Sequence, residues 1–197
     1  MINLEKLFKT QKLLDNRIVD EHGLHGQDLL PQKILALQVE LGELANEWRG
    51  FKFWSKDQEP RTEVICHACK GDGLFYLNGE LESECTYCDA TGIQEKNPLL
   101  EEYVDGIHFI LSIGNDLKID IREWSIEPFK NKTILDQFSQ TYYVISDLQF
   151  DPNKIDLVIV LEHFVALGEL LGFTPEQIEQ AYYEKNAINH TRQDNKY

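Results

Sequence analysis

Two pairs of acidic residues at helical spacing are the residues of this chain best suited to chemistry. Glu40 and Glu43 form one pair, and Glu102 and Asp105 form the other. A step of three residues places both carboxylates of a pair on one face of an α-helix, one above the other. If the two helices face each other, four carboxylates surround one space. Such oxygen ligands suit Mg²⁺, which in an acidic cleft commonly serves phosphate chemistry.

The surroundings of the second pair favour a metal site. Apolar residues cover most of the helix predicted between Pro98 and Asp116, as is typical of a buried helix. Glu102 falls on an expected core face of that helix. Burying a carboxylate without a partner costs on the order of several kcal/mol, so a cation or a basic side chain must neutralise it. The first pair, taken alone, is equally compatible with the solvated flank of an amphipathic helix.

The last predicted helix carries cationic and amide side chains on one face. It opens with a capping box at Thr174 and Pro175 and runs to about Arg192. Lysine and arginine bind phosphate oxygens, and asparagine adds neutral hydrogen bonds. A solvated helix face is the alternative for this helix alone. Together with the acidic pairs and the aromatic residues Trp48, Phe51, Phe53 and Trp54, it suggests a pocket for metal, phosphates and a base. The polar residues within an arc of roughly 120° are Tyr182, Lys185, Asn186, Asn189, Arg192 and Gln193.

All four cysteines lie in two CxxC knuckles, Cys66–Cys69 and Cys85–Cys88, each followed by glycine. This spacing predicts a closed, structural Zn²⁺ site with four thiolate ligands. Two disulfides or a redox pair are the alternatives, and we expect His67 to be a bystander. The repeats resemble the CxxCxGxG units of the DnaJ cysteine-rich domain, with Ala90 where glycine is expected. Metal binding would supply the folding energy of so small a segment.

Six helices are expected to position these groups, at about 4–19, 31–49, 98–116, 132–149, 153–171 and 175–192. The predicted fold is therefore an all-α bundle, formed by residues 1–58 and 96–197. Residues 59–95 would be a small zinc-knuckle insert between two core helices, and residues 20–30 a loop.

Composition narrows the class of protein. A chain of 197 residues supports one sizeable core. Its formal charge of −15 disfavours nucleic-acid binding, which depends on neutralising phosphates. There is no apolar stretch long enough to predict a membrane span, and the N-terminus does not resemble a secretory signal. A cytoplasmic location is expected.

Several segments together resemble the all-α dimeric dUTPases, which are related to the MazG pyrophosphohydrolases. Residues 37–47 with the aromatic stretch 51–55 resemble the first metal motif of that family, and residues 101–109 resemble the second. Residues 182–193 resemble its C-terminal phosphate motif. Gln11 and Asp15 match the motif that reads the base, although some relatives have asparagine at the position of Asp15. The cysteine insert is a departure from the compact members of the family.

The resemblance implies Mg²⁺-dependent conversion of dUTP to dUMP and pyrophosphate by a homodimer. The Mg²⁺ ligands would be Glu40, Glu43, Glu102 and Asp105, with either Glu40 or Glu43 as the base that activates water. The residues implied in substrate binding are Gln11, Asp15, Trp54, His108, Lys185, Asn186, Asn189 and Arg192.

Three other functions stay open at this point. One is a MazG-like pyrophosphohydrolase with another nucleotide preference, such as dCTP; cleavage of dUDP is also open. Another is a zinc-containing interaction protein without catalysis. The third is a nuclease or other metal-dependent phosphoesterase.

Overall fold

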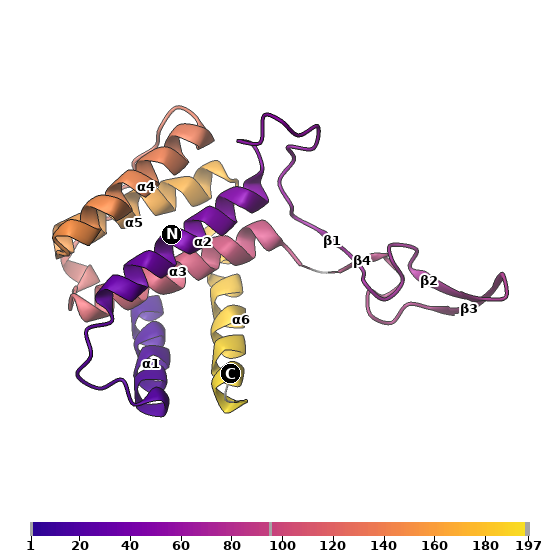
Figure 1. Ribbon diagram of the computed structural model, residues 1–197, viewed down its shortest axis with the longest axis horizontal. Coiled ribbons are helices and arrows are strands. Elements are labelled where there is room, and N and C mark those ends of the chain that lie inside the picture. Colours follow the sequence, from indigo (N-terminus) through magenta and orange to yellow (C-terminus); the bar gives the residue numbers. More distant parts are fainter. Residues whose placement is uncertain (1, 95, 196–197) are drawn as a thin grey trace.

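Helices form the body of the protein in a computed structural model that describes residues 2–94 and 96–195 (Figure 1). Within these residues there are six α-helices and a single turn of 3-10 helix, η1 (Ile121–Glu123). The predicted all-α fold is confirmed. The α-helices are α1 (Leu4–His22), α2 (Leu30–Trp48), α3 (Pro98–Asp116), α4 (Ile134–Phe150), α5 (Lys154–Leu170) and α6 (Pro175–Asp194).

Helix ends follow local capping chemistry. The predicted capping box of α6 is present, because Thr174 Oγ1 accepts from the amide of Gln177, and the Gln177 side chain accepts from the amide of Thr174. Asn97 caps α3 ahead of Pro98. The predicted end of the first helix at residue 19 is wrong by about one turn. The helix continues to His22, where Gly23 ends it in the left-handed region, at φ 64°.

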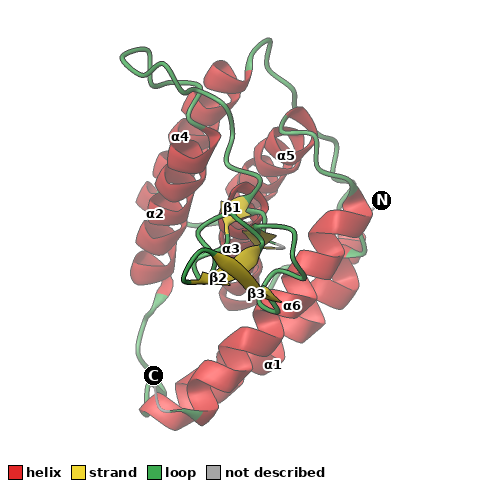
Figure 2. Cartoon of the chain, turned by 90° about the vertical axis from the view of Figure 1, so that its right-hand side faces the viewer, coloured by secondary structure: helices red, strands yellow, loops and turns green. Residues whose placement is uncertain are grey.

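Helix α3 is the centre of the bundle and packs against α1, α2, α5 and α6 (Figures 1 and 2). Its side chains are buried around most of its circumference, as its apolar pattern predicted. The fully buried Tyr103 stacks on Phe164 of α5 with ring centroids 4.8 Å apart, and donates a hydrogen bond of 3.2 Å to the Phe164 carbonyl. The acidic residues of α3 are therefore attached to a helix that is packed on several sides.

The cysteine-rich segment lies between α2 and α3 and extends away from the bundle (Figure 1). Strands β1 (Val64–Ile65) and β4 (Ile93–Gln94) pair at its base, and β2 (Leu74–Leu77) and β3 (Glu80–Glu84) form an antiparallel hairpin beyond them. Asn78 and Gly79 connect β2 to β3 with positive φ angles of 53° and 88°, as in the two-residue turns that match strand twist.

No single helix among the described residues has both the length and the apolar content to cross a membrane. Helices α5 and α6 reach these limits only as a pair, which is bent by 110°.

The contact between α3 and α5 gives a stability prediction. A Cβ atom on Gly106 would lie 2.4 Å from the Phe164 ring, and that ring is held by Tyr103. We expect Gly106→Ala to lower the free energy of unfolding by about 1–3 kcal/mol, because overpacking a core contact is destabilising. Chemical denaturation would measure the change. Since Gly→Ala inside a helix is ordinarily stabilising, an unchanged or more stable variant would contradict this packing.

Candidate active site

Three carboxylates from two helices converge where α2 packs on α3. One carboxylate oxygen from each of Glu40, Glu102 and Asp105 lies within 4.8 Å of the other two. Glu43 is exposed and its carboxylate lies outside this group. The expected cage of four carboxylates is therefore a cluster of three with a fourth acid beside it. Three oxygen donors at this separation match the chemistry of a Mg²⁺ site.

The cluster holds more negative charge than its surroundings neutralise. Burial, followed by the charges of Asp105 and Glu43, raises the pKa of Glu40 to about 7. Burial together with Asp105, Glu43 and Glu40 raises the pKa of Glu102 to about 7 as well. Glu102 is half-buried rather than enclosed in the core, because it faces Glu40 across the edge of the α2–α3 contact. Glu43 therefore acts on both residues electrostatically.

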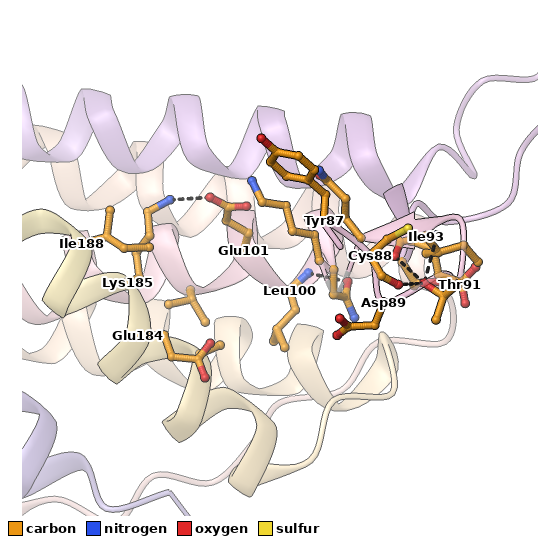
Figure 3. A pocket seen from close by; sticks show the side chains of 17 residues that line it. Tyr87, Cys88, Asp89, Thr91, Ile93, Leu100, Glu101, Glu184, Lys185 and Ile188 are labelled. Carbon is orange, nitrogen blue, oxygen red and sulfur yellow. Dashed lines mark hydrogen bonds and ion pairs between the residues drawn. The ribbon is translucent and has the colours of Figure 1, made fainter. Parts of the chain in front are cut away.

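One buried cation lies against this cluster. The ammonium group of Lys185, on α6, donates to Asp105 Oδ2 at 2.6 Å and to Glu101 Oε1 at 2.9 Å; Figure 3 shows the second contact. Burial by itself would lower the pKa of Lys185. The hydrogen bonds to Asp105 and Glu101 outweigh this effect, so the pKa of the lysine is raised. The lysine was predicted from sequence as a phosphate ligand. Its partner Glu101 was not, although it shares the polar edge of α3 with Asp105.

A cavity of about 300 Å³ opens beside the carboxylates, between α1, α2, α3 and α6. It brings Glu40 and Asp105 together with the predicted base-reading residues of α1 and with the C-terminal motif of α6. Lys33 and Ser112 also line it and were not predicted from the sequence. The predicted site residues that line this cavity are Gln11, Asp15, Glu40, Asp105, His108, Asn189 and Arg192.

A buried hydrogen-bond network forms the floor of this cavity. The side-chain amide of Gln11 donates to Asp15 Oδ1 at 2.8 Å, and its carbonyl oxygen accepts from the Tyr182 hydroxyl at 3.0 Å. The same oxygen lies 2.7 Å from His108 Nδ1. Burial, followed by the charge of Lys185, lowers the pKa of His108 to about 3, so the ring is neutral. Since the Gln11 oxygen can only accept, His108 carries its proton on Nδ1.

Asp15 is the carboxylate of this network. Burial raises its pKa, although hydrogen bonds from Gln11, Ser112 and Asn115 act in the opposite direction. Those bonds hold its carboxylate against the cavity wall. Gln11 already uses both ends of its amide within the protein, so it orders this wall as well as lining it.

Two predicted substrate contacts lie away from this cavity. Trp54 is 65% exposed and contacts Phe51 and Phe53, while Trp48 packs on Phe138 in the core. The prediction that these aromatics gather at the base pocket is therefore wrong for Trp48, and Trp54 lines neither this cavity nor the larger one beside the insert. Asn186 is buried and also lines neither of them.

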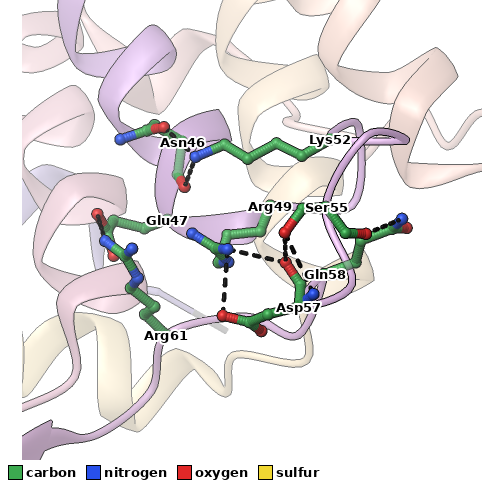
Figure 4. Close-up of polar contacts among 8 residues, drawn as sticks. All are labelled: Asn46, Glu47, Arg49, Lys52, Ser55, Asp57, Gln58 and Arg61. Atoms are coloured by element: carbon green, nitrogen blue, oxygen red, sulfur yellow. Dashed lines mark hydrogen bonds and ion pairs between the residues drawn. The ribbon is translucent and has the colours of Figure 1, made fainter.

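The loop that follows α2 determines where Trp54 lies. Arg49 ends the helix with a positive φ of 65°. Its guanidinium donates to the backbone oxygen of Asp57 at 2.8 Å and pairs with the Asp57 carboxylate at 3.1 Å (Figure 4). Lys52 turns back to bond Asn46. The aromatic residues are consequently carried on a loop folded onto the end of α2.

The four cysteines are outside any disulfide, buried and gathered at one point. The sulfurs of Cys66 and Cys85 are 3.8 Å apart, and those of Cys69 and Cys88 are 3.7 Å apart. A tetrahedral zinc site with Zn–S bonds of about 2.3 Å has sulfur–sulfur edges of about 3.8 Å, so the arrangement fits zinc. No disulfide joins these cysteines, which argues against the disulfide alternative.

The comparison with protein families agrees with this geometry. The family model described as dUTPase matches residues 3–97 and 79–197, two segments that overlap over residues 79–97. The chain belongs to the all-α dUTPase family. It is therefore a nucleotide pyrophosphohydrolase of the dUTP diphosphatase class. The non-catalytic interaction protein considered from the sequence is wrong. No curated protein matches the chain.

The acidic cluster of this dUTPase predicts a stability that depends on pH. The pKa of Glu102 rises from 4.5 to about 7, so the folded protein holds this proton more tightly than the unfolded chain does. Without divalent cations, the stability contributed by protonated Glu102 is fully present below pH 4.5 and is lost as the pH rises through 7. We expect Glu102→Gln to raise the melting temperature in EDTA at about pH 8, with the gain vanishing near pH 4.5.

Thermal melts across this pH range would measure the effect. Glu82→Gln, on the exposed strand β3, is the matched control and should show no such trend. Added Mg²⁺ should raise the melting temperature of the wild-type protein more than that of Glu102→Gln. A gain that is equal at both ends of the pH range would contradict the electrostatic interpretation.

Proposed function

We propose that this dUTPase converts dUTP to dUMP and pyrophosphate in a Mg²⁺-dependent reaction, in the cavity between α1, α2, α3 and α6. The observation that carries the proposal is the convergence of Glu40, Glu102 and Asp105 within 4.8 Å beside the predicted phosphate-binding helix. The raised pKa values of Glu40 and Glu102 indicate that these carboxylates need additional positive charge. Divalent cations and the lysine and arginine of α6 are complementary to both the carboxylates and a triphosphate.

The carboxylates divide the metal-binding and base roles in this proposal. Glu40, Glu102 and Asp105 would hold Mg²⁺, which when bound neutralises the charge that develops on the phosphates. Glu43 lies outside the cluster but close enough to influence Glu40 and Glu102. We assign to Glu43 the orientation and deprotonation of the attacking water, with Glu40 as the alternative base.

The rest of the cavity would hold the nucleotide. Asn189 and Arg192 line this cavity and would bind the phosphates together with Lys185, which lies beside it on Asp105. On the opposite wall, Asp15 and Gln11 present acceptor and donor groups ordered by the network with His108, which suits the alternating acceptors and donor on the edge of uracil. Substrate contacts by Trp54 and Asn186 would require rearrangement of the loop after α2 and of α6. From the family resemblance we also propose that the protein is a homodimer. A second candidate substrate to test is dUDP.

The cysteine cluster would hold one structural zinc ion. Four thiolates leave no open coordination position, so this metal would have no direct part in hydrolysis. Backbone amides of Gly73 and Gly92 point at the sulfurs of Cys69 and Cys88, both at 3.2 Å, and would stabilise their thiolates. Cβ atoms on these glycines would approach the carbonyl oxygens of Ala90 and Gly71 to 2.2 and 2.1 Å. Only glycine therefore fits these turns.

Hydrolysis of a nucleotide panel tests the proposed reaction. With Mg²⁺, we expect pyrophosphate from dUTP in preference to dCTP, dTTP and UTP, and no product in excess EDTA. Glu40→Gln should retain the fold and lower kcat/KM by roughly 10²-fold or more, because it removes a group that acts in the transition state. Glu82→Gln should behave as the wild type. Wild-type turnover by Glu40→Gln would refute the assigned site, and preference for another base would change the proposed substrate.

Metal analysis tests the zinc site. Wild-type protein should contain about one zinc per chain, and Cys69→Ser should lose most of it, since a structural site needs all four ligands. His67→Ala is the matched control, because His67 bonds Gln94 rather than the cysteines and should leave the zinc content unchanged. Zinc retained by Cys69→Ser would contradict a four-thiolate site.

A further inference from the structure

The ammonium group of Lys185 lies between two carboxylates that belong to one helix. Glu101 and Asp105 are four residues apart on α3, so their side chains share one face. Lys185 Nζ is 2.6 Å from Asp105 and 2.9 Å from Glu101, and the lysine is 8% exposed. The two carboxylates thus hold the end of a flexible side chain that would otherwise sample many rotamers.

The two partners of this lysine have different surroundings. Asp105 belongs to the cluster with Glu40 and Glu102, whereas Glu101 does not. Instead, Glu101 and Lys185 together line a larger cavity of about 970 Å³, whose far wall includes Tyr87 of the second cysteine knuckle and Asp89, which follows that knuckle (Figure 3). A cation bound to Asp105 would therefore compete with Lys185 for one of its two carboxylates and leave the other undisturbed.

We infer that Glu101 is a positioning residue, which holds the Lys185 ammonium beside the metal cluster when Asp105 binds a cation. This inference rests on the proposed function of the same site. Two positive charges cannot share Asp105 without repulsion. When a cation occupies Asp105, Lys185 keeps its contact with Glu101. Its ammonium group then stays near the cluster and is available to phosphate oxygens. Without Glu101, Lys185 either stays on Asp105 and opposes cation binding or moves away from the phosphates.

The effect of Glu101 on substrate binding is tested with Glu101→Gln, which keeps the shape of the side chain and removes its charge. We expect KM for dUTP to rise roughly fivefold to tenfold, as for the weakening of a charge-assisted hydrogen bond to a neutral one, with a smaller change in kcat. Mg²⁺ binding to the substrate-free protein, measured by isothermal titration calorimetry, should weaken as well. Melting temperature and circular dichroism should remain close to those of the wild type. Glu184→Gln is the matched control, because Glu184 is exposed on the wall of the same cavity and bonds Gln180 instead of Lys185.

A double-mutant cycle separates positioning from a direct role. Lys185→Met should raise KM at least as much as Glu101→Gln, and adding Glu101→Gln to Lys185→Met should cause no further change. The inference would be overturned if Glu101→Gln raised KM equally in the wild-type and Lys185→Met backgrounds. Unchanged KM and Mg²⁺ binding in Glu101→Gln would overturn it as well. These results differ from failure of the proposed function, in which the wild-type protein itself would not hydrolyse dUTP.

Discussion

The proximity of like charges at the α2–α3 contact governs the arrangement of this site. Glu40, Glu102 and Asp105 approach within 4.8 Å of one another, with Glu43 close by. In a partly buried setting, such a group is unfavourable unless protons or cations compensate it. Lys185 supplies one positive charge, and the pKa values of Glu40 and Glu102 near 7 show that this is insufficient. The protein thus maintains a local electrostatic cost that a divalent cation would relieve.

The hydrophobic core makes this cost tolerable. Helix α3 is buried around most of its circumference and is held by Tyr103 and Phe164 at its contact with α5. Repulsion among the carboxylates cannot easily separate α2 from α3, because doing so would expose the buried apolar surface of both helices. The same rigidity positions the network formed by Gln11, His108 and Tyr182, so that the carboxylate cluster and the opposite wall of the cavity are fixed relative to each other.

The cysteine-rich insert has its own buried cluster, which is separate from the apolar core of the bundle. It contributes little apolar surface to the bundle, and its buried residues are chiefly the four cysteines. Its turns depend on positive φ angles, including that of Ala90 at 62°, a conformation that glycine adopts more readily than alanine. Because the second knuckle lines the cavity that also contains Glu101 of α3 and Lys185 of α6, the insert and these two helices share a surface.

The sequence by itself determined the helices, the capping box at Thr174 and the grouping of the cysteines, because periodicity, caps and short spacings are local properties. It also identified the two acidic pairs and, through the order of several motifs, the family. Only the tertiary structure decided that Glu43 lies outside the carboxylate cluster, that Glu101 is a partner of Lys185, and that Trp54 lies on an exposed loop. These relations depend on how each helix is rotated against its neighbours and on side-chain contacts such as that of Arg49 with Asp57. Periodicity defines the faces of one helix but not which faces meet.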